Sequence, residues 1–414
     1  MAGDAGVRVY HYRWVVLGAF ALLNAVVQLN WITFAPVTAE AADYYGVSDL
    51  QIGLLSMVFM VVFVVMSIPA SYIIDTYGLR AGVGIGAVLT GVFGLTRGLL
   101  GSQFTWVFVS QVGLAVGQPF VMNAITKVGA RWFPLAERAT AAAVPSLAQF
   151  VGIIAAMAAT PVLLEGLEKD LSGLLVVYGV LSVGTALLAL ALIREGPPTP
   201  PEEAEVEERT RVFAGLRRIV RQRDMLILLL LFFVGLGMFN AISTWIEDLV
   251  EPRGFSSEQA GMIGAAMVIG GIVGAAVLSV ASDRLRRRKP FLVLAVAGMA
   301  PGLVGLTFAT GYPLLLASSA VFGFFLMSAY PVGFQYSAEV SYPAPEATSQ
   351  GLLVMAGQVS GILFILGMDA FRTGRGDEMT GSMVVFIVLT ALVAVLSLFL
   401  RESPMMLKQQ DAGR

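Results

Sequence analysis

The hydrophobic positions of this sequence fall into twelve long runs separated by short polar segments. A membrane-spanning α-helix takes about 20 apolar residues, and each run is long enough and is bounded by charge, proline or glycine. The runs lie near residues 14–36, 50–74, 81–100, 104–128, 138–163, 172–193, 224–250, 257–281, 290–309, 312–337, 347–369 and 380–400. The pattern predicts an all-α membrane protein with 12 transmembrane helices in two pseudo-symmetric six-helix bundles.

The composition agrees with this pattern and removes several classes of function. Hydrophobic residues make up 57% of the 414 residues and charged residues 13%, whereas an average soluble domain is about 25% charged. Cysteine is absent and His11 is the single histidine, which excludes a disulfide framework and a Cys- or His-based metal cluster. No nucleophile–base pair or phosphate-binding loop is present. We therefore predict neither an enzyme nor a binder of nucleic acid, and no cofactor or metal.

One polar segment separates the two sets of runs. Residues 194–223 hold four prolines, then five glutamates, then six arginines. The sequence predicts an N-terminal bundle at 1–193, a cytoplasmic linker with a short basic amphipathic helix at 194–223, and a C-terminal bundle at 224–414.

The basic residues predict the orientation in the membrane. If the N-terminus is cytoplasmic, 21 of the 26 Lys and Arg residues lie on the cytoplasmic side. The five on the outer side are Arg97, Lys169, Arg253, Arg372 and Arg375. The positive-inside rule therefore places both termini in the cytoplasm, and we expect a multi-pass protein of the plasma (inner) membrane. The first run has no small-residue cleavage site, so it is interpreted as a retained span.

The second half of the chain repeats the first at an offset of about 208 residues. Residues 51–53 align with 259–261, 71–75 with 279–283 and 139–140 with 347–348, and a further shift of one residue aligns Gln149 with Gln358. Parallel repeats of this size, with substrate bound near the midplane, are the architecture of the major facilitator superfamily. The sequence is thereby identified as resembling that superfamily.

Loops after the second and eighth runs resemble the superfamily's cytoplasmic signature, an acidic residue followed by basic ones. Asp75 precedes Arg80, and Asp283 precedes Arg284. The resemblance implies that these residues gate the two halves, and positive-inside anchoring is the alternative. We add Glu247, near the outer surface, and Glu339, near the cytoplasmic end of its run, as candidates for gating or coupling.

Several stretches resemble a narrower family, the feline leukaemia virus subgroup C receptor family of choline, ethanolamine and haem-related transporters. They are NWITF at 30–34, YYGV at 44–47, LSMV at 55–58, AEVSYP at 338–343, SQGLL at 349–353 and QVSGI at 358–362. The resemblance implies substrate contacts by Trp31, Gln149 and Gln358. Where the family has a tyrosine on helix seven, this chain has Asn240, which departs from an aromatic choline cage.

The residues themselves point to the same polar wall. Asn24, Gln28 and Trp31 share one face of the first run, because their spacing follows the helical period. A lipid-facing side would not tolerate two amides, so we expect this face inside the bundle. The seventh run carries a similar polar face. From the seventh run we assign substrate binding to Asn240, Ser243 and Trp245, and from the tenth run to Tyr330, whose side chain we expect to face inward. For Gln149 and Gln358, interhelical packing is the alternative role.

These features predict a secondary transporter that moves a small polar organic solute, an amine such as choline or ethanolamine, by alternating access. A tryptophan face attracts ammonium groups, and the scarcity of mid-span carboxylates favours uniport or exchange. The alternatives are an organic-anion exchanger that uses Arg97 and Lys127, a proton-coupled symporter and, less favoured, a non-transporting receptor. Arg97 is otherwise expected to snorkel to the interface. The expected partners are the substrate and the lipid bilayer, with the protein a monomer.

Overall fold

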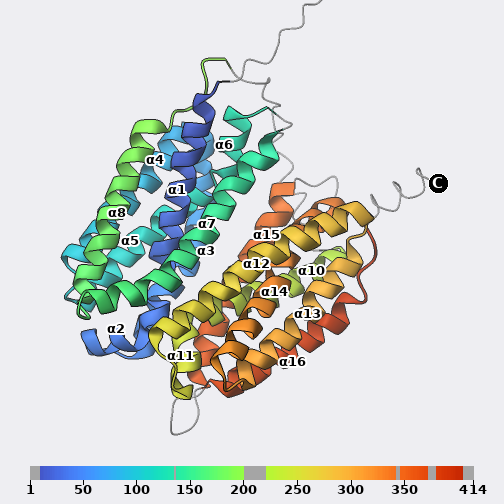
Figure 1. Cartoon of the computed structure of the whole chain (residues 1–414). Coiled ribbons are helices and arrows are strands. Elements are labelled where there is room, and N and C mark those ends of the chain that lie inside the picture. The colour runs from blue at the N-terminus through green and yellow to red at the C-terminus, as the bar shows by residue number, and fades with distance from the viewer. Residues whose placement is uncertain (1–9, 135–136, 200–220, 342–345, 372–378, 404–414) are drawn as a thin grey trace, which may run out of the picture. The chain divides into compact units, whose positions relative to one another are not determined.

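The structure, a computed structural model, describes residues 10–134, 137–199, 221–341, 346–371 and 379–403. Within these ranges the chain is helical and contains no strand (Figure 1). Twelve helices of the described chain are long and apolar enough to cross a membrane. The predicted all-α architecture with 12 spans is confirmed. The predicted amphipathic helix of the linker lies mostly outside the described residues.

The chain divides into two compact units, Met1–Val206 and Glu207–Arg414, and this division falls within the predicted linker at 194–223. The helices of the first unit are α1 (Tyr12–Ile32), the 3-10 turn η1 (Ala35–Val37), α2 (Thr38–Tyr45), α3 (Asp49–Tyr77), α4 (Leu79–Leu99), α5 (Phe104–Met122), α6 (Ile125–Trp132), α7 (Arg138–Gly166) and α8 (Leu171–Leu192). Those of the second are α10 (Arg223–Thr244), α11 (Ile246–Val250), η4 (Glu251–Arg253), α12 (Ser257–Leu285), α13 (Lys289–Phe308), α14 (Tyr312–Ser341), α15 (Glu346–Ala370) and α16 (Thr380–Ser397).

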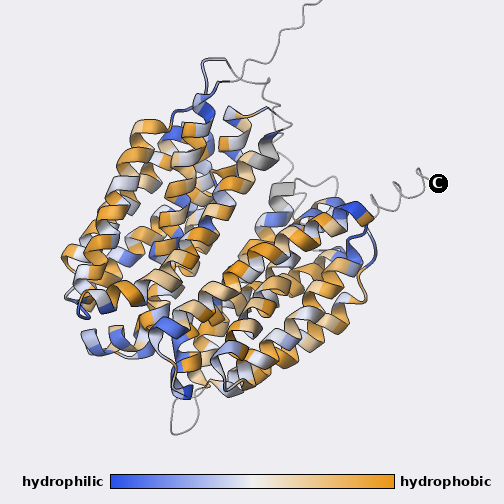
Figure 2. Ribbon diagram, in the orientation of Figure 1, coloured by the Kyte–Doolittle hydropathy of each residue, from blue (hydrophilic) through white to orange (hydrophobic). Residues whose placement is uncertain are grey.

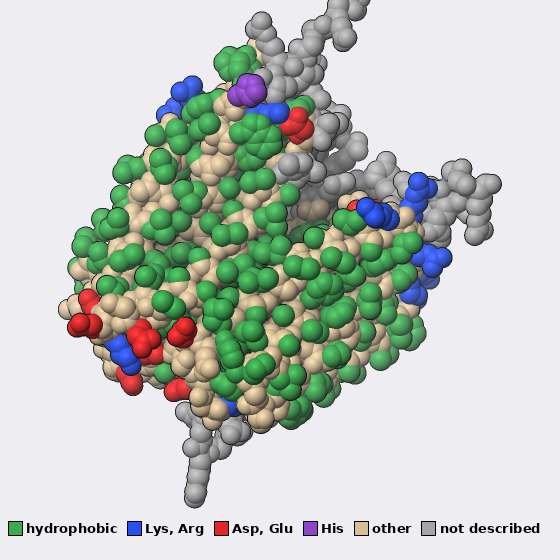
Figure 3. Space-filling view, in the orientation of Figure 1, with side chains coloured by type: hydrophobic (Ala, Val, Ile, Leu, Met, Phe, Trp, Pro, Cys, Tyr) green, Lys and Arg blue, Asp and Glu red, His purple; other side chains and the backbone are tan. Residues whose placement is uncertain are grey.

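Apolar side chains cover the outside of the spans. The ribbons are hydrophobic along most of their length and hydrophilic near their ends (Figure 2), and on the face shown in Figure 3 charged side chains gather toward the ends of the helices. Ile68, Val65 and Leu187 are 72%, 65% and 62% exposed. Such surfaces are stable only against lipid, so the exposed apolar faces are those of a membrane protein.

The predicted duplication has a direct structural counterpart. Helices α3 and α12 have the same length, 29 residues each, and begin with the same capping box. Ser48 and Gln51 form this box at α3, and Ser256 and Gln259 form it at α12. A capping box satisfies backbone N–H groups that the first turn leaves free. The aligned glutamines found in the sequence are therefore two copies of one helix start.

Helix pairing repeats as well. In the first unit α1 packs on α7, α3 on α5, α4 on α5, and α4 on α8; the corresponding pairs of the second are α10 with α15, α12 with α14, α13 with α14, and α13 with α16. Both units thus pair their first span with the fifth, the second with the fourth, and the third with the fourth and sixth. The polar residues predicted on the first and fifth spans of each half are brought side by side by this pairing.

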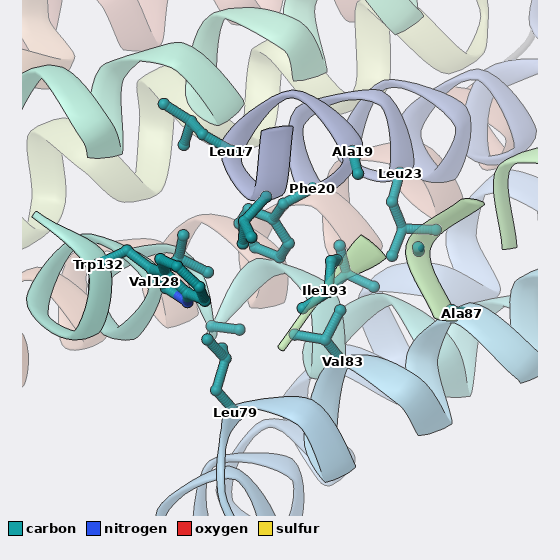
Figure 4. Close-up of a cluster of buried hydrophobic side chains, with 14 of the residues drawn as sticks. Leu17, Ala19, Phe20, Leu23, Leu79, Val83, Ala87, Val128, Trp132 and Ile193 are labelled. Carbon is teal, nitrogen blue, oxygen red and sulfur yellow. The ribbon is translucent and has the colours of Figure 1, made fainter. Parts of the chain in front are cut away.

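Near one end of the first unit, a hydrophobic cluster fixes α1 against its neighbours. Phe20 and Leu23 of α1 pack there with Val83 of α4, Trp132 of α6 and Ile193, and each of these side chains is at most 4% exposed (Figure 4). Burying side chains of this size contributes about 1.5–3 kcal/mol each. The cluster holds the start of α1, one turn before the first polar residue of the predicted site.

The first span of each half is broken near its end. Helix α1 ends at Ile32 and continues, after Thr33 and Phe34, as η1 and α2. Helix α10 ends at Thr244 and continues after Trp245 as α11. The hydrophobic pattern predicted unbroken runs at 14–36 and 224–250, because hydropathy does not register a local change of backbone direction. Breaks of this kind expose backbone carbonyls that need other donors.

Candidate functional site

Three amides of the first half form one hydrogen-bonded chain between α1 and α7. Asn24 Nδ2 donates to the carbonyl oxygen of Phe20 at 2.9 Å, and Gln149 Nε2 donates to Asn24 Oδ1 at 3.0 Å. Gln28 Nε2 then donates to Gln149 Oε1 at 3.3 Å and lies 3.7 Å from Met122 Sδ. The structure thus brings together three of the residues predicted to bind substrate.

A close approach of the two helices makes this amide chain possible. Gly152 lies one turn beyond Gln149 on α7, and a Cβ atom at this position would overlap the carbonyl oxygen of Ala25 on α1. The missing side chain therefore sets the distance at which Gln149 reaches α1. Asn24 and Gln28 are 1% and 6% exposed, and Gln149 is half-buried, so Gln149 is the more accessible end of the wall.

The second half carries the equivalent pair between α10 and α15. Asn240 Nδ2 lies 3.4 Å from Gln358 Oε1 and 3.5 Å from the carbonyl oxygen of Gly357. Asn240 is 5% exposed and Gln358 is half-buried. In each half, an amide of the first span thus donates to the glutamine of the fifth span. The two glutamines occupy the pseudo-symmetric positions that the sequence offset predicted.

The two tryptophans of the broken spans are buried anchors. Trp31 is 6% exposed; its Nε1 donates to the carbonyl oxygen of Ser56 at 3.1 Å, and Ser56 Oγ donates back to the carbonyl of Trp31 at 3.5 Å. Trp245 is fully buried, and its Nε1 donates to the carbonyl oxygen of Ile365 at 3.2 Å. Each indole therefore ties the end of a first span to another helix of its own half.

The other predicted members of the second half lie on α10, α11 and α14. Ser243 is fully buried, and its Oγ has no hydrogen-bond partner among the described residues. Glu247 is 1% exposed and accepts a hydrogen bond from Ser257 Oγ. Tyr330 lies edge-on to Phe232, with ring centroids 5.5 Å apart, beside a small cavity lined by apolar residues of α10 and α13. Tyr330 therefore borders an apolar cavity, while Ser243 and Glu247 are buried polar groups.

A buried arginine joins three spans of the first half. Arg97 is fully buried: its Nη1 donates to the carbonyl oxygen of Asn30 at 3.1 Å and to Gln111 Oε1 at 2.8 Å, and its Nη2 donates to Asn30 Oδ1 at 2.6 Å. The expectation that Arg97 snorkels is wrong, because these acceptors hold the guanidinium inside the unit. It caps the carbonyl end of α1, where a helix favours positive charge. This role of Arg97 was not predicted, although Asn30 and Gln111 are polar residues within apolar runs of the sequence.

In the first half, the residues predicted to gate form contacts inside their own unit. Asp75 pairs with Lys127 Nζ at 3.1 Å, and Lys127 also donates to the carbonyl oxygen of Ile74. The backbone N–H of Arg80 donates to Glu195 Oε2 at 2.9 Å, while its side chain is exposed. Lys127, proposed above for an anion exchanger, is thus engaged by a carboxylate.

In the second half, Arg288 is the centre of the charged cluster. It donates to Asp283, and its Nη2 lies 3.1 Å from Glu339 Oε1; Arg284, the predicted gating residue, is exposed instead. Burial lowers the pKa of Arg288, but hydrogen bonds to Asp283 and Glu339 outweigh it and raise that pKa above its usual value. Arg288 stands 208 positions after Arg80, so the repeat offset indicates Arg288, and not Arg284, as the counterpart of Arg80.

A carboxylate from the end of each half binds the start of its third span. Glu195 accepts hydrogen bonds from the N–H groups of Leu79 and Arg80 at 3.0 and 2.9 Å. Glu402 accepts from those of Arg288 and Lys289 at 2.7 and 3.2 Å. An acidic group at a helix N-terminus is favoured by the helix dipole. In the sequence, the two carboxylates are recognisable because each follows an arginine directly after the last span of its half, as Arg194-Glu195 and Arg401-Glu402.

Twelve spans in two repeated units, with amides on the first and fifth span of each, define a membrane transporter. The family model of the Major Facilitator Superfamily matches residues 20–365 and 247–414. The chain belongs to this superfamily, and the predicted resemblance to it is confirmed.

Curated relatives narrow the assignment to solute carrier family 49. The chain is 33% identical over 388 residues to "Solute carrier family 49 member A3" of Danio rerio, covering 90% of this chain and 81% of the relative. It is 29% identical over 418 residues to "Choline/ethanolamine transporter FLVCR1" of Mus musculus, covering 92% and 75%. Among solved structures, an inward-facing, unoccupied bacterial homologue of the human lysosomal transporter Spinster shares the fold, with a TM-score of 0.76, 17% identity, and coverage of 97% and 99%.

Proposed function

We propose that this transporter moves a small organic amine, of the kind represented by choline and ethanolamine, by uniport or exchange through alternating access. The observation that carries the proposal is the repeated amide pair, Gln28 with Gln149 and Asn240 with Gln358. Buried amides are costly in a membrane unless they are bonded, and the two half-buried glutamines keep polar surface within apolar spans. The name of the mouse relative supplies the substrate class.

Amide walls suit a solute that carries both a positive charge and a hydroxyl group. Amide oxygens attract an ammonium group, and amide nitrogens donate to hydroxyl oxygens. We propose that Gln149, Gln358 and the ring of Trp31 contact the substrate, and that Asn24, Ser243, Trp245 and Tyr330 support this wall. Asp75, Arg80, Asp283, Arg284, Glu247 and Glu339 remain proposed gating residues, and both termini are proposed to face the cytoplasm.

The decisive experiment is uptake of radiolabelled choline and ethanolamine into proteoliposomes. We expect saturable uptake by the wild type, and at low substrate a loss of about tenfold in Gln358→Met, the equivalent of one hydrogen bond of about 1.4 kcal/mol. The matched control is Val359→Ala, whose side chain is 39% exposed and lies next along α15. No uptake of either amine by the wild type, or equal uptake by Gln358→Met, would refute the proposal.

Anion exchange receives less support from the contacts of the two cations assigned to it. Arg97 is enclosed by Asn30 and Gln111, and Lys127 is paired with Asp75. A substrate anion would have to replace these partners. Proton symport is also less favoured, because Glu339 is held by Arg288 and Glu247 by Ser257.

A further inference from the structure

We infer that Gln28 selects substrates that donate a hydrogen bond, because its amide oxygen is held as an unfilled acceptor at the end of the amide chain of α1 and α7. The inference rests on the proposed amine transport and adds a requirement to it. A substrate must present an N–H or O–H group to Gln28 Oε1. Molecules of the same charge and similar size without such a group are bound less tightly.

The orientation of every amide in the chain follows from one backbone carbonyl. The carbonyl oxygen of Phe20 can only accept, so Asn24 must turn Nδ2 toward it and Oδ1 toward Gln149. Gln149 must then present Nε2 to Asn24 and Oε1 to Gln28. Gln28 must in turn present Nε2 to Gln149. Its Oε1 is left as the free end.

A second contact fixes Gln28 in the same sense. Its Nε2 also lies 3.7 Å from Met122 Sδ, and a thioether sulfur is a weak acceptor. Turning the amide over would place the oxygen against two acceptors at once. Both neighbours therefore favour the nitrogen, and the free atom is an acceptor.

The free acceptor is buried. The Gln28 side chain is 6% exposed, and its Oε1 accepts no hydrogen bond within the part of the chain that the structure describes. A buried acceptor without a donor is costly, whereas an incoming donor recovers that cost as binding energy. Trp31, the aromatic candidate for the ammonium group, lies three residues along the same helix and therefore on the same face.

The second half ends with the opposite polarity. There the carbonyl oxygen of Gly357 attracts Asn240 Nδ2, which also faces Gln358 Oε1, so the free end of that pair is Gln358 Nε2, a donor. The glutamine of the fifth span thus ends the pair of the second half with a donor, whereas Gln28 ends the chain of the first half with an acceptor. Gln358 therefore serves as a control for Gln28, because it is also a glutamine but its free atom is a donor.

Choline and its methyl ether test the requirement directly. Choline carries one O–H group, whereas O-methylcholine has the same charge and no donor. Binding to purified protein is measured by competition with radiolabelled choline. We expect the wild type to bind choline about tenfold more tightly than the ether. In Gln28→Met the two ligands should bind with equal affinity.

Gln358→Met is the matched control, because both ligands retain an oxygen that can accept from Gln358. It should weaken both ligands by the same factor and keep the tenfold preference. Equal binding of both ligands to the wild type overturns the inference even if Gln28→Met does not fold. Persistence of the preference in Gln28→Met also overturns it, as does its loss in Gln358→Met. A wild type that binds neither amine overturns the proposed function together with this inference, and so differs from the other outcomes.

Discussion

Replacing Arg97 by methionine tests whether a buried charge stabilises the first half when its partners among the described residues are amide and carbonyl oxygens. Asn30 O keeps a hydrogen bond from Gln111 Nε2 at 3.2 Å, so the substitution leaves two acceptors without their Arg97 donor, Asn30 Oδ1 and Gln111 Oε1. A buried acceptor left unpaired costs about 1–3 kcal/mol, giving a loss of about 2–6 kcal/mol. Relief of guanidinium desolvation offsets part of this. We therefore expect the free energy of unfolding to fall by about 2–4 kcal/mol, the lower half of this range.

For a unit of about 200 residues, a loss of about 2–4 kcal/mol lowers Tm by about 4–16 °C. The assay is heat-induced unfolding in nanodiscs, followed by tryptophan fluorescence. Arg131→Met is the control, because Arg131 is exposed in the same unit and surface changes stay within about 0.5 kcal/mol. Arg97→Lys should also be destabilised, since an ammonium group lacks the planar fork. A Tm of Arg97→Met at or above that of the wild type would show that desolvation outweighs the hydrogen bonds.

Three further outcomes are expected. Gly152→Val should abolish uptake, because the added side chain pushes α7 away from α1. Gly166→Val is the control and should transport normally, because a Cβ atom at Gly166 meets nothing within 4 Å. Equal uptake by the two variants would contradict the close packing of α1 and α7. Arg288→Met should lower stability by about 3–5 kcal/mol, because Glu339 is left as a buried charge, and adding Glu339→Met should restore most of it. The raised pKa means that the contribution of Arg288 is present below its usual pKa and lost only at higher, strongly alkaline pH. The Tm difference between wild type and Arg288→Met should therefore be the same at pH 6 and pH 9, and a difference that shrinks at pH 9 would contradict this.

Most of the fold was predictable because each span is a local property of the sequence. Length and apolarity gave the twelve helices, and the offset between Gln51 and Gln259 predicted two copies of one unit. The breaks after Ile32 and Thr244 were not predicted. They depend on donors and contacts from other helices, which hydropathy does not contain.

The candidate site was predictable in its members but not in its connections. The helical period placed Asn24 and Gln28 on one face, and the repeat paired Gln149 with Gln358. Which amide donates to which follows from the carbonyl of Phe20, a backbone group that carries no sequence signal. Arg97 was misjudged for the same reason, because its acceptors lie 67 and 14 positions away along the chain.

The carboxylates of Glu195 and Glu402 have a consequence for biogenesis. Glu195 binds the start of α4 but lies 116 positions after Leu79, beyond the last helix of its half. During synthesis the N–H groups in the first turn of α4 therefore lack the Glu195 carboxylate as acceptor until α8 has been made and inserted. Each half reaches its final hydrogen bonding only when its own last helix has left the ribosome. A nascent chain whose Glu195 is still inside the ribosome should accordingly be open to proteases at the α3–α4 turn, and a chain long enough for Glu195 to have emerged should be protected.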